Sequence, residues 1–100
     1  GYILTAAAEA DLRGIIRYTR KHWGEPQVRR YVAALESGMA HLSEHQGVYQ
    51  DMSAIYPGLC MAHCEHHYLF CLSRQSAPAL IVAILHERMD LMTRLSGRLK

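Results

Sequence analysis

The chain has 100 residues, of which half are hydrophobic and 20% are charged, and its formal net charge is +2. This size and composition predict one domain over residues 1–100 with a hydrophobic core, and they exclude a disordered segment. No apolar run approaches the roughly 18 residues that a membrane span needs, and no signal peptide is visible. The three cysteines are an odd number, which favours free thiols in the cytoplasm over a secreted disulfide scaffold.

The first half of the chain predicts a short strand followed by two helices. Tyr2-Ile3-Leu4 is β-prone, and Thr5 occupies the N-cap position before three alanines. Gly24 is expected to end the first helix, and Pro26 to begin the second, which should end near residues 45–47. Apolar residues spaced by three or four positions run through both segments: Ala8, Leu12, Ile15, Ile16 and Trp23, then Val28, Tyr31, Val32, Leu35, Met39 and Leu42. Two amphipathic helices with one tight break predict an antiparallel helical hairpin.

The second half predicts strands and a short terminal helix. Residues 48–59 show no period, and two strands are expected over residues 59–64 and 67–72. The six apolar residues Leu80 to Leu85 are too few for a helix and predict a buried central strand, whose charged continuation His86-Glu87-Arg88 emerges at a sheet edge. Leu91, Met92 and Leu95 then indicate a short amphipathic helix ended by Gly97. The resulting order predicts an α+β fold: an N-terminal strand, a helical hairpin, a three-stranded antiparallel meander and a short C-terminal helix, with the hairpin on one face of the sheet.

Several phrases, in this order, resemble the RelE/ParE superfamily of toxins from bacterial toxin–antitoxin modules, and the ParE-type branch most closely. They are Leu4-Thr5-Ala6-Ala7-Ala8-Glu9-Ala10-Asp11-Leu12, Ile16-Arg17-Tyr18-Thr19, His22-Trp23-Gly24, Tyr31-Val32-Ala33-Ala34-Leu35, Pro57-Gly58-Leu59, His67-Tyr68-Leu69-Phe70 and Ile84-Leu85-His86-Glu87-Arg88-Met89-Asp90. The resemblance implies a non-secreted toxin of a type II module that is neutralised by a cognate antitoxin, itself partly disordered when free. ParE-type members are known as inhibitors of DNA gyrase, whereas RelE-type relatives share the fold and cut mRNA on the ribosome, so the fold alone does not choose between the two activities.

The RelE-like alternative requires a proton donor or acceptor beside cations that hold a phosphate. His86 is the candidate acid or base, with Arg88 or Arg74 as the phosphate clamp, and an extended backbone would place His86 and Arg88 on one face. The predicted strands carry no Lys, and the region from residue 59 to residue 85 contributes only Arg74. This scarcity of cations favours a binding protein that is not an enzyme.

A Cys- and His-rich segment could indicate a metal site. Cys60, His63, Cys64, His66 and His67 are residue types that bind zinc, but all five lie within eight residues rather than in two separated pairs. We therefore expect no metal and no cofactor, with the cysteines as small core or edge residues. A third hypothesis is that the protein keeps the toxin fold but has lost toxicity, and serves as a structural or metal-binding module.

Two sets of residues are candidate contacts with other proteins. The basic series Arg13, Arg17, Arg20 and Lys21, with Arg29 and Arg30 after the turn, predicts a solvated helix face or an electrostatic surface, without sequence-specific DNA binding. Within the helical hairpin and the tail, the candidates for target binding are Arg20, Lys21, Trp23, Arg94 and Arg98. Apolar side chains in excess of what a small core can bury are the candidates for antitoxin binding: Tyr18, Tyr31, Met89, Leu91, Met92 and Leu95.

Overall fold

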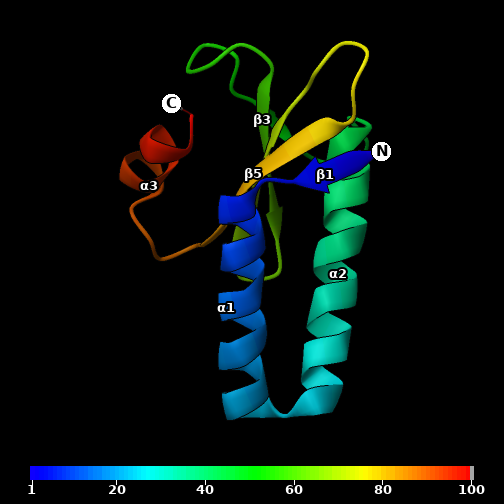
Figure 1. Cartoon of the computed structure of the whole chain (residues 1–100), viewed down its shortest axis with the longest axis vertical. Helices are drawn as coiled ribbons and strands as arrows, with labels where there is room; N and C mark the ends of the chain where they lie inside the picture. The colour runs from blue at the N-terminus through cyan, green and yellow to red at the C-terminus, as the bar shows by residue number, and fades with distance from the viewer. Residues whose placement is uncertain (100) are drawn as a thin grey trace.

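The computed structural model describes residues 1–99 and confirms the predicted α+β class. In chain order, its elements are β1 (Tyr2–Leu4), α1 (Ala6–Trp23), α2 (Glu25–Ser43), β2 (Gln50–Asp51), β3 (Leu59–Cys64), β4 (His67–Leu72), β5 (Ala79–His86) and α3 (Leu91–Arg98). Figure 1 shows the α1–α2 hairpin extending well past the strands, so that the connection between the two helices lies at one end of the molecule.

The sheet has the order β1-β5-β4-β3-β2. Strands β3, β4 and β5 form the predicted antiparallel meander, and β1 pairs in parallel with β5 from Tyr2 opposite Ala79 to Leu4 opposite Ile81. Strand β2 was not predicted: Gln50 and Asp51 are exposed and pair with only Met61 and Cys60, so they leave no alternating pattern. β5 is buried within the sheet, as expected from its apolar run.

Local signals set the ends of the two long helices. The Thr5 hydroxyl accepts a hydrogen bond from the Ala8 N–H at 3.2 Å, which confirms the N-cap. Gly24 ends α1 with φ +85° and donates its N–H to the Arg20 carbonyl, and Pro26 lies in the first turn of α2. α2 ends at Ser43, a little earlier than predicted.

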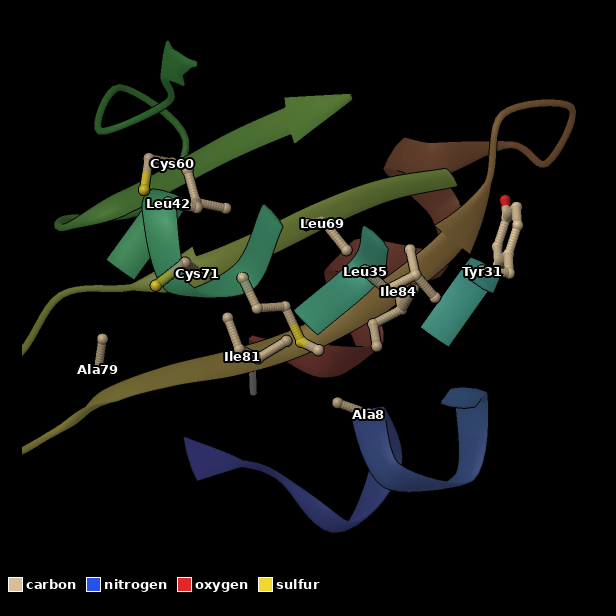
Figure 2. Packing of buried hydrophobic residues seen from close by; sticks show 11 residues of the cluster. Ala8, Tyr31, Leu35, Leu42, Cys60, Leu69, Cys71, Ala79, Ile81 and Ile84 are labelled. Atoms are coloured by element: carbon tan, nitrogen blue, oxygen red, sulfur yellow. The ribbon is translucent and has the colours of Figure 1, made fainter. Parts of the chain in front are cut away.

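Both faces of the sheet are covered, and each cover encloses a separate apolar cluster. On the hairpin face the cluster includes Ala8, Tyr31, Leu35, Met39, Leu42, Cys60, Leu69, Cys71, Ala79, Ile81 and Ile84. Figure 2 shows this cluster with Ala79 at one end and Tyr31 at the other. On the opposite face, α3 and the segment before β3 enclose Met52, Leu59, Phe70, Val82, Ala83, Leu85 and Leu95.

Close approach of α2 to the sheet depends on Gly38. A Cβ at this position would lie 2.9 Å from Leu69 Cδ1 and 3.0 Å from Cys64 Sγ, so any larger residue would displace the helix or these side chains. The cysteines at 60, 64 and 71 are all free thiols, in line with the prediction. Among residues 1–99, none of the helices combines the length and the apolar character that crossing a membrane requires.

Candidate binding groove

A groove of about 890 Å³ opens between α1, the start of α2 and the end of the sheet where β5 finishes. Its lining is mostly apolar, with a few polar groups at the sheet end: Ala10, Asp11, Gly14, Ile15, Tyr18, Thr19, Trp23, Gln27, Tyr31, His66, His67, Ile84, His86 and Met89. Among residues 1–99, no Lys or Arg lines this groove. Such a groove suits an apolar segment of another molecule and offers no cationic group for a phosphate.

α1 supplies one wall because its residues recur every three or four positions on a single side. Ala10, Gly14 and Tyr18 follow this spacing, and Gly14 leaves the middle of the wall without a side chain. Tyr18 is 60% exposed and stacks on the His22 ring, and Trp23 is 70% exposed at the last helical position. These large side chains therefore border the groove instead of filling the core, and their exposure marks a surface for a partner.

The sheet end of the groove holds a buried hydrogen-bond chain. The Tyr31 hydroxyl accepts from the His66 N–H at 3.0 Å and lies 2.7 Å from His67 Nδ1, to which it donates its own proton. Burial, and then the neighbouring His86 and His66, lower the pKa of His67 to about 4. His67 is therefore neutral at physiological pH and accepts at Nδ1. These hydrogen bonds hold the β3–β4 turn against α2.

The three residues of the RelE-like alternative do not come together. β5 ends at His86, so Arg88 lies in the following turn and donates its backbone N–H to His86 Nδ1 at 3.1 Å; the prediction that both share a strand face is wrong. Arg74 donates to the Pro78 carbonyl before β5 begins, which places it about 25 Å from His86 along the strand. His86 instead packs edge-on against His67, with ring centroids 5.2 Å apart.

An ion pair closes the free edge of β5 beside the groove. The Arg98 guanidinium donates to both Asp11 carboxylate oxygens at 2.8 Å and to the Val82 carbonyl at 3.0 Å, and Asp11 accepts from the Ile84 N–H at 3.0 Å. These two side chains thus replace the strand partner that β1 is too short to provide. Arg98, which we predicted as a candidate for target binding, thus has its guanidinium paired with Asp11 and holds α3 to α1.

The predicted antitoxin-binding residues separate into two places. Tyr18, Tyr31 and Met89 line the groove, although Tyr31 is only 8% exposed. Leu91, Met92 and Leu95 belong to α3 on the other face of the sheet. Leu95 is 1% exposed and is part of the core, so the prediction of a surface role for it is wrong.

The remaining target-binding candidates are exposed. Arg20, Lys21 and Trp23 lie near the end of the helical hairpin, where Arg20 pairs with Glu25 at 2.7 Å. Arg94 is exposed on α3. The hairpin end and α3 are therefore distinct surfaces, and the candidates do not form one patch.

The Cys- and His-rich segment is divided between the two faces of the sheet. Cys60 packs in the cluster under the hairpin, and Cys64 donates its thiol to the Ala34 carbonyl at 3.4 Å. His63 and His66 contact opposite oxygens of Glu87, at 2.8 and 3.0 Å. Within the described part of the chain, no three His, Cys, Asp or Glu side chains are arranged to hold a metal ion.

Sequence reasoning missed several residues of the groove. Asp11, Gly14, His66 and His67 were not among the candidates for partner binding. The spacing of Ala10, Gly14 and Tyr18 was a usable signal for the α1 wall. By contrast, nothing local in the sequence indicates that Tyr31 contacts residues 66 and 67, because that contact joins α2 to a distant turn.

Known proteins resemble this chain over almost its full length. A family model described as "ParE toxin of type II toxin-antitoxin system, parDE" matches residues 2–91. "Toxin ParE" of Escherichia coli is 69% identical over 99% of this chain and 96% of that protein, and "Toxin ParE1" of Caulobacter vibrioides is 28% identical over 89% of this chain and 91% of that protein. A solved chain titled "Chromosomal ParDE TA system from P. aeruginosa" shares the fold with a TM-score of 0.68 at 18% identity, covering 86% of this chain and 94% of its own. Because the family model matches residues 2–91 and the Escherichia coli relative is 69% identical over 99% of the chain, this chain belongs to the ParE toxin family of type II toxin–antitoxin systems.

Proposed function

We propose that this toxin inhibits DNA gyrase by binding it, without catalysing a reaction, and that a cognate antitoxin neutralises it by occupying the groove between α1 and the end of β5. The observation that carries the proposal is the groove itself: about 890 Å³, bordered by exposed aromatic residues and lined without Lys or Arg in the part of the chain that the structure describes. A surface of this kind binds an apolar protein segment.

The antitoxin segment that fits this groove is an amphipathic one that becomes ordered on binding. Tyr18 and Met89 both line the groove, are 60% and 41% exposed, and supply adaptable apolar contacts. The Tyr31–His67 pair and His86 supply a polar floor at one end. An amphipathic helix laid along α1 would bury the exposed apolar side chains and leave its polar face in water.

Gyrase contact is assigned to the end of the helical hairpin. Lys21 and Trp23 are exposed there, together with the ion pair of Arg20 and Glu25. Exposed Trp and Arg side chains are frequent at the centres of protein interfaces. Arg94 on α3 is the candidate for a second contact.

Cleavage of mRNA is less well supported than binding. A ribonuclease must stabilise the charge that develops on the phosphate, which requires cations within hydrogen-bond distance of the acid and base. His86 has its Nδ1 engaged by the Arg88 backbone, and the groove beside it presents imidazoles, a tyrosine and an already paired carboxylate. This polar set can orient a partner but offers no cationic clamp.

A supercoiling assay tests the proposal directly. Purified toxin in molar excess is expected to stop gyrase from supercoiling relaxed plasmid, and addition of the antitoxin encoded beside it should restore supercoiling. Unimpeded supercoiling at high toxin excess would exclude gyrase as the target. A reporter mRNA in a translating extract should remain uncut; cleavage that disappears in His86→Ala would instead establish the ribonuclease activity.

A further inference from the structure

Positive charge is concentrated in the helical hairpin. Residues 13 to 30 contain six of the eleven Lys and Arg residues and one of the nine Asp and Glu residues, so their formal charge is +5. The rest of the chain carries a formal charge of −3, and the net value of +2 conceals this separation. A protein with such an asymmetry is oriented by the electric field of a polyanion.

All six cations are exposed on the helical hairpin. Arg13, Arg17, Arg20 and Lys21 are exposed and lie on the side of α1 opposite the buried Ala8 and Thr19. Arg29 and Arg30 are exposed in the second turn of α2. We call these six residues the basic face.

Most residues of the basic face make no ion pair within residues 1–99, although Glu25 also lies near Arg29. Among residues 1–99, Arg20 is the one member with an ion pair, to Glu25, and both of these side chains are about half exposed. Arg30 donates to the neutral Gln27 amide. The charges are therefore available to a ligand, and solvent-exposed pairing of this kind is weak enough to exchange.

We propose that the basic face binds the phosphate backbone of duplex DNA, without reading its sequence. Five of the six cations are arginines, whose planar guanidinium donates two parallel hydrogen bonds to phosphate oxygens. The rise of an α-helix places Arg13 and Lys21 about 12 Å apart along α1. Phosphates recur about every 3.4 Å of duplex axis on each strand, so this stripe faces three or four of them.

Phosphates fit the basic face better than an acidic protein does. A regular array of anions engages cations spaced along one exposed helix, whereas carboxylates on a folded protein follow no such repeat. The inference goes beyond the proposed gyrase inhibition: it is measured without gyrase, although gyrase would present DNA to the toxin.

The test is binding of the purified toxin to a fluorescein-labelled 20-base-pair duplex, followed by anisotropy at several salt concentrations. We expect a dissociation constant on the order of micromolar at 50 mM salt, and a plot of log affinity against log salt with a slope of about −3 for three or four neutralised phosphates. Two unrelated duplex sequences should bind within two-fold of each other.

Matched double variants locate the contact. Arg17→Gln with Lys21→Gln should weaken duplex binding at least ten-fold and make the salt slope shallower by about two. Arg74→Gln with Arg88→Gln removes the same charge from exposed sites outside the hairpin and should change affinity less than two-fold. Circular dichroism should show that all the variants are folded, because every substituted side chain is exposed.

Three results would overturn the inference: no duplex binding by the parent at 50 mM salt, equal losses in the two double variants, or a salt-independent affinity. A polyglutamate peptide serves as the acidic-protein probe. If the peptide binds with the same dependence on Arg17 and Lys21 while the duplex does not, the basic face is a protein-binding surface. The supercoiling assay remains a separate readout, so a failure here leaves the gyrase proposal standing.

Discussion

The two faces of the sheet are covered in different ways. The helices α1 and α2, of 18 and 19 residues, cover one face, bring buried polar groups with them and leave a groove at one end. The other face is covered by the eight-residue helix α3 and the segment before β3, over a cluster that consists of apolar side chains. The hairpin face therefore carries most of the surfaces that we assign to partners, whereas the α3 face mainly completes the core and offers Arg94 as a second contact.

The faces also differ in what attaches each cover to the sheet. The hairpin is held by a broad apolar cluster together with the Tyr31–His67 hydrogen bond. α3 buries one fully enclosed side chain, Leu95, and is attached to α1 and β5 through Arg98. A single polar side chain thus contributes a larger share of the attachment on the α3 face than on the hairpin face. The following variants test that difference.

The largest effect is expected from Arg98→Ala. The change leaves the Asp11 carboxylate, which is 16% exposed, with the Ile84 N–H but without its charged partner, and it leaves the Val82 carbonyl without the guanidinium donor; it should cost about 3 kcal/mol of unfolding free energy. Urea denaturation measures the loss, and hydrogen exchange should show α3 opening before the hairpin. Arg98→Lys keeps the charge but lacks the forked donor, so it should recover part of the stability. An unchanged denaturation midpoint in Arg98→Ala would contradict the role of this ion pair.

The hairpin face should lose stability in acid through His67. Its native pKa of about 4 lies below the unfolded value of 6.5, so the unfolded chain binds the proton first and stability falls as pH drops from 6.5 toward 4. Between pH 7.5 and pH 4.5 this group should remove about 2 to 3 kcal/mol of unfolding free energy.

The control for this acid effect is His67→Gln, which cannot take up the proton. It should be less stable than the parent at pH 7.5 and should lose less additional stability on acidification. Urea titrations at the two pH values measure both quantities. Parallel losses in the parent and the variant would mean that His67 is not the titrating group.

Gly38→Ala tests the close packing of the hairpin against the sheet. The new methyl group would lie 2.9 Å from Leu69 Cδ1, so we expect a loss of about 1 to 2 kcal/mol in spite of the better helix propensity of alanine. Gly97→Ala in α3 is the matched control, because a Cβ there meets nothing within 4 Å, and it should be neutral or slightly stabilising. Equal denaturation midpoints for the two variants would show that α2 adjusts freely over the sheet.

The order of elements was predictable because its signals are local. Thr5, Gly24 and Pro26 mark helix ends through their own backbone and side-chain chemistry, and the apolar run before His86 is long enough to identify a buried strand. We did not predict β2 because its two exposed residues are too few to show an alternating hydrophobic pattern. This strand is defined only by its pairing with β3. Local chemistry therefore predicts elements well and very short edge strands poorly.

The site was less predictable because its contacts join distant parts of the chain. Asp11 and Arg98 are 87 positions apart, and Tyr31 and His67 are 36 apart; neither pair is indicated by spacing. The sequence spacing of apolar residues on an amphipathic helix is the same whether a residue faces the core or borders a groove. Leu95 is an example of the first case and Tyr18 of the second. Only the packing of each helix against the sheet, α3 for Leu95 and α1 for Tyr18, distinguishes these two outcomes.

The smallest predicted effect compares two methionines on either side of Asp90, the N-cap of α3. Met89 and Met92 are 41% and 48% exposed, but Met89 lines the groove, whereas Met92 lies on α3. If the antitoxin occupies the groove, Met89→Ala should weaken its binding about ten-fold, or about 1.4 kcal/mol, and Met92→Ala should change it less than two-fold. Isothermal titration with the antitoxin measures both, and a larger loss for Met92→Ala would place the antitoxin on the α3 face. Because both side chains are exposed and both substitutions remove the same atoms, a difference between them must come from the partner and not from the stability of the fold.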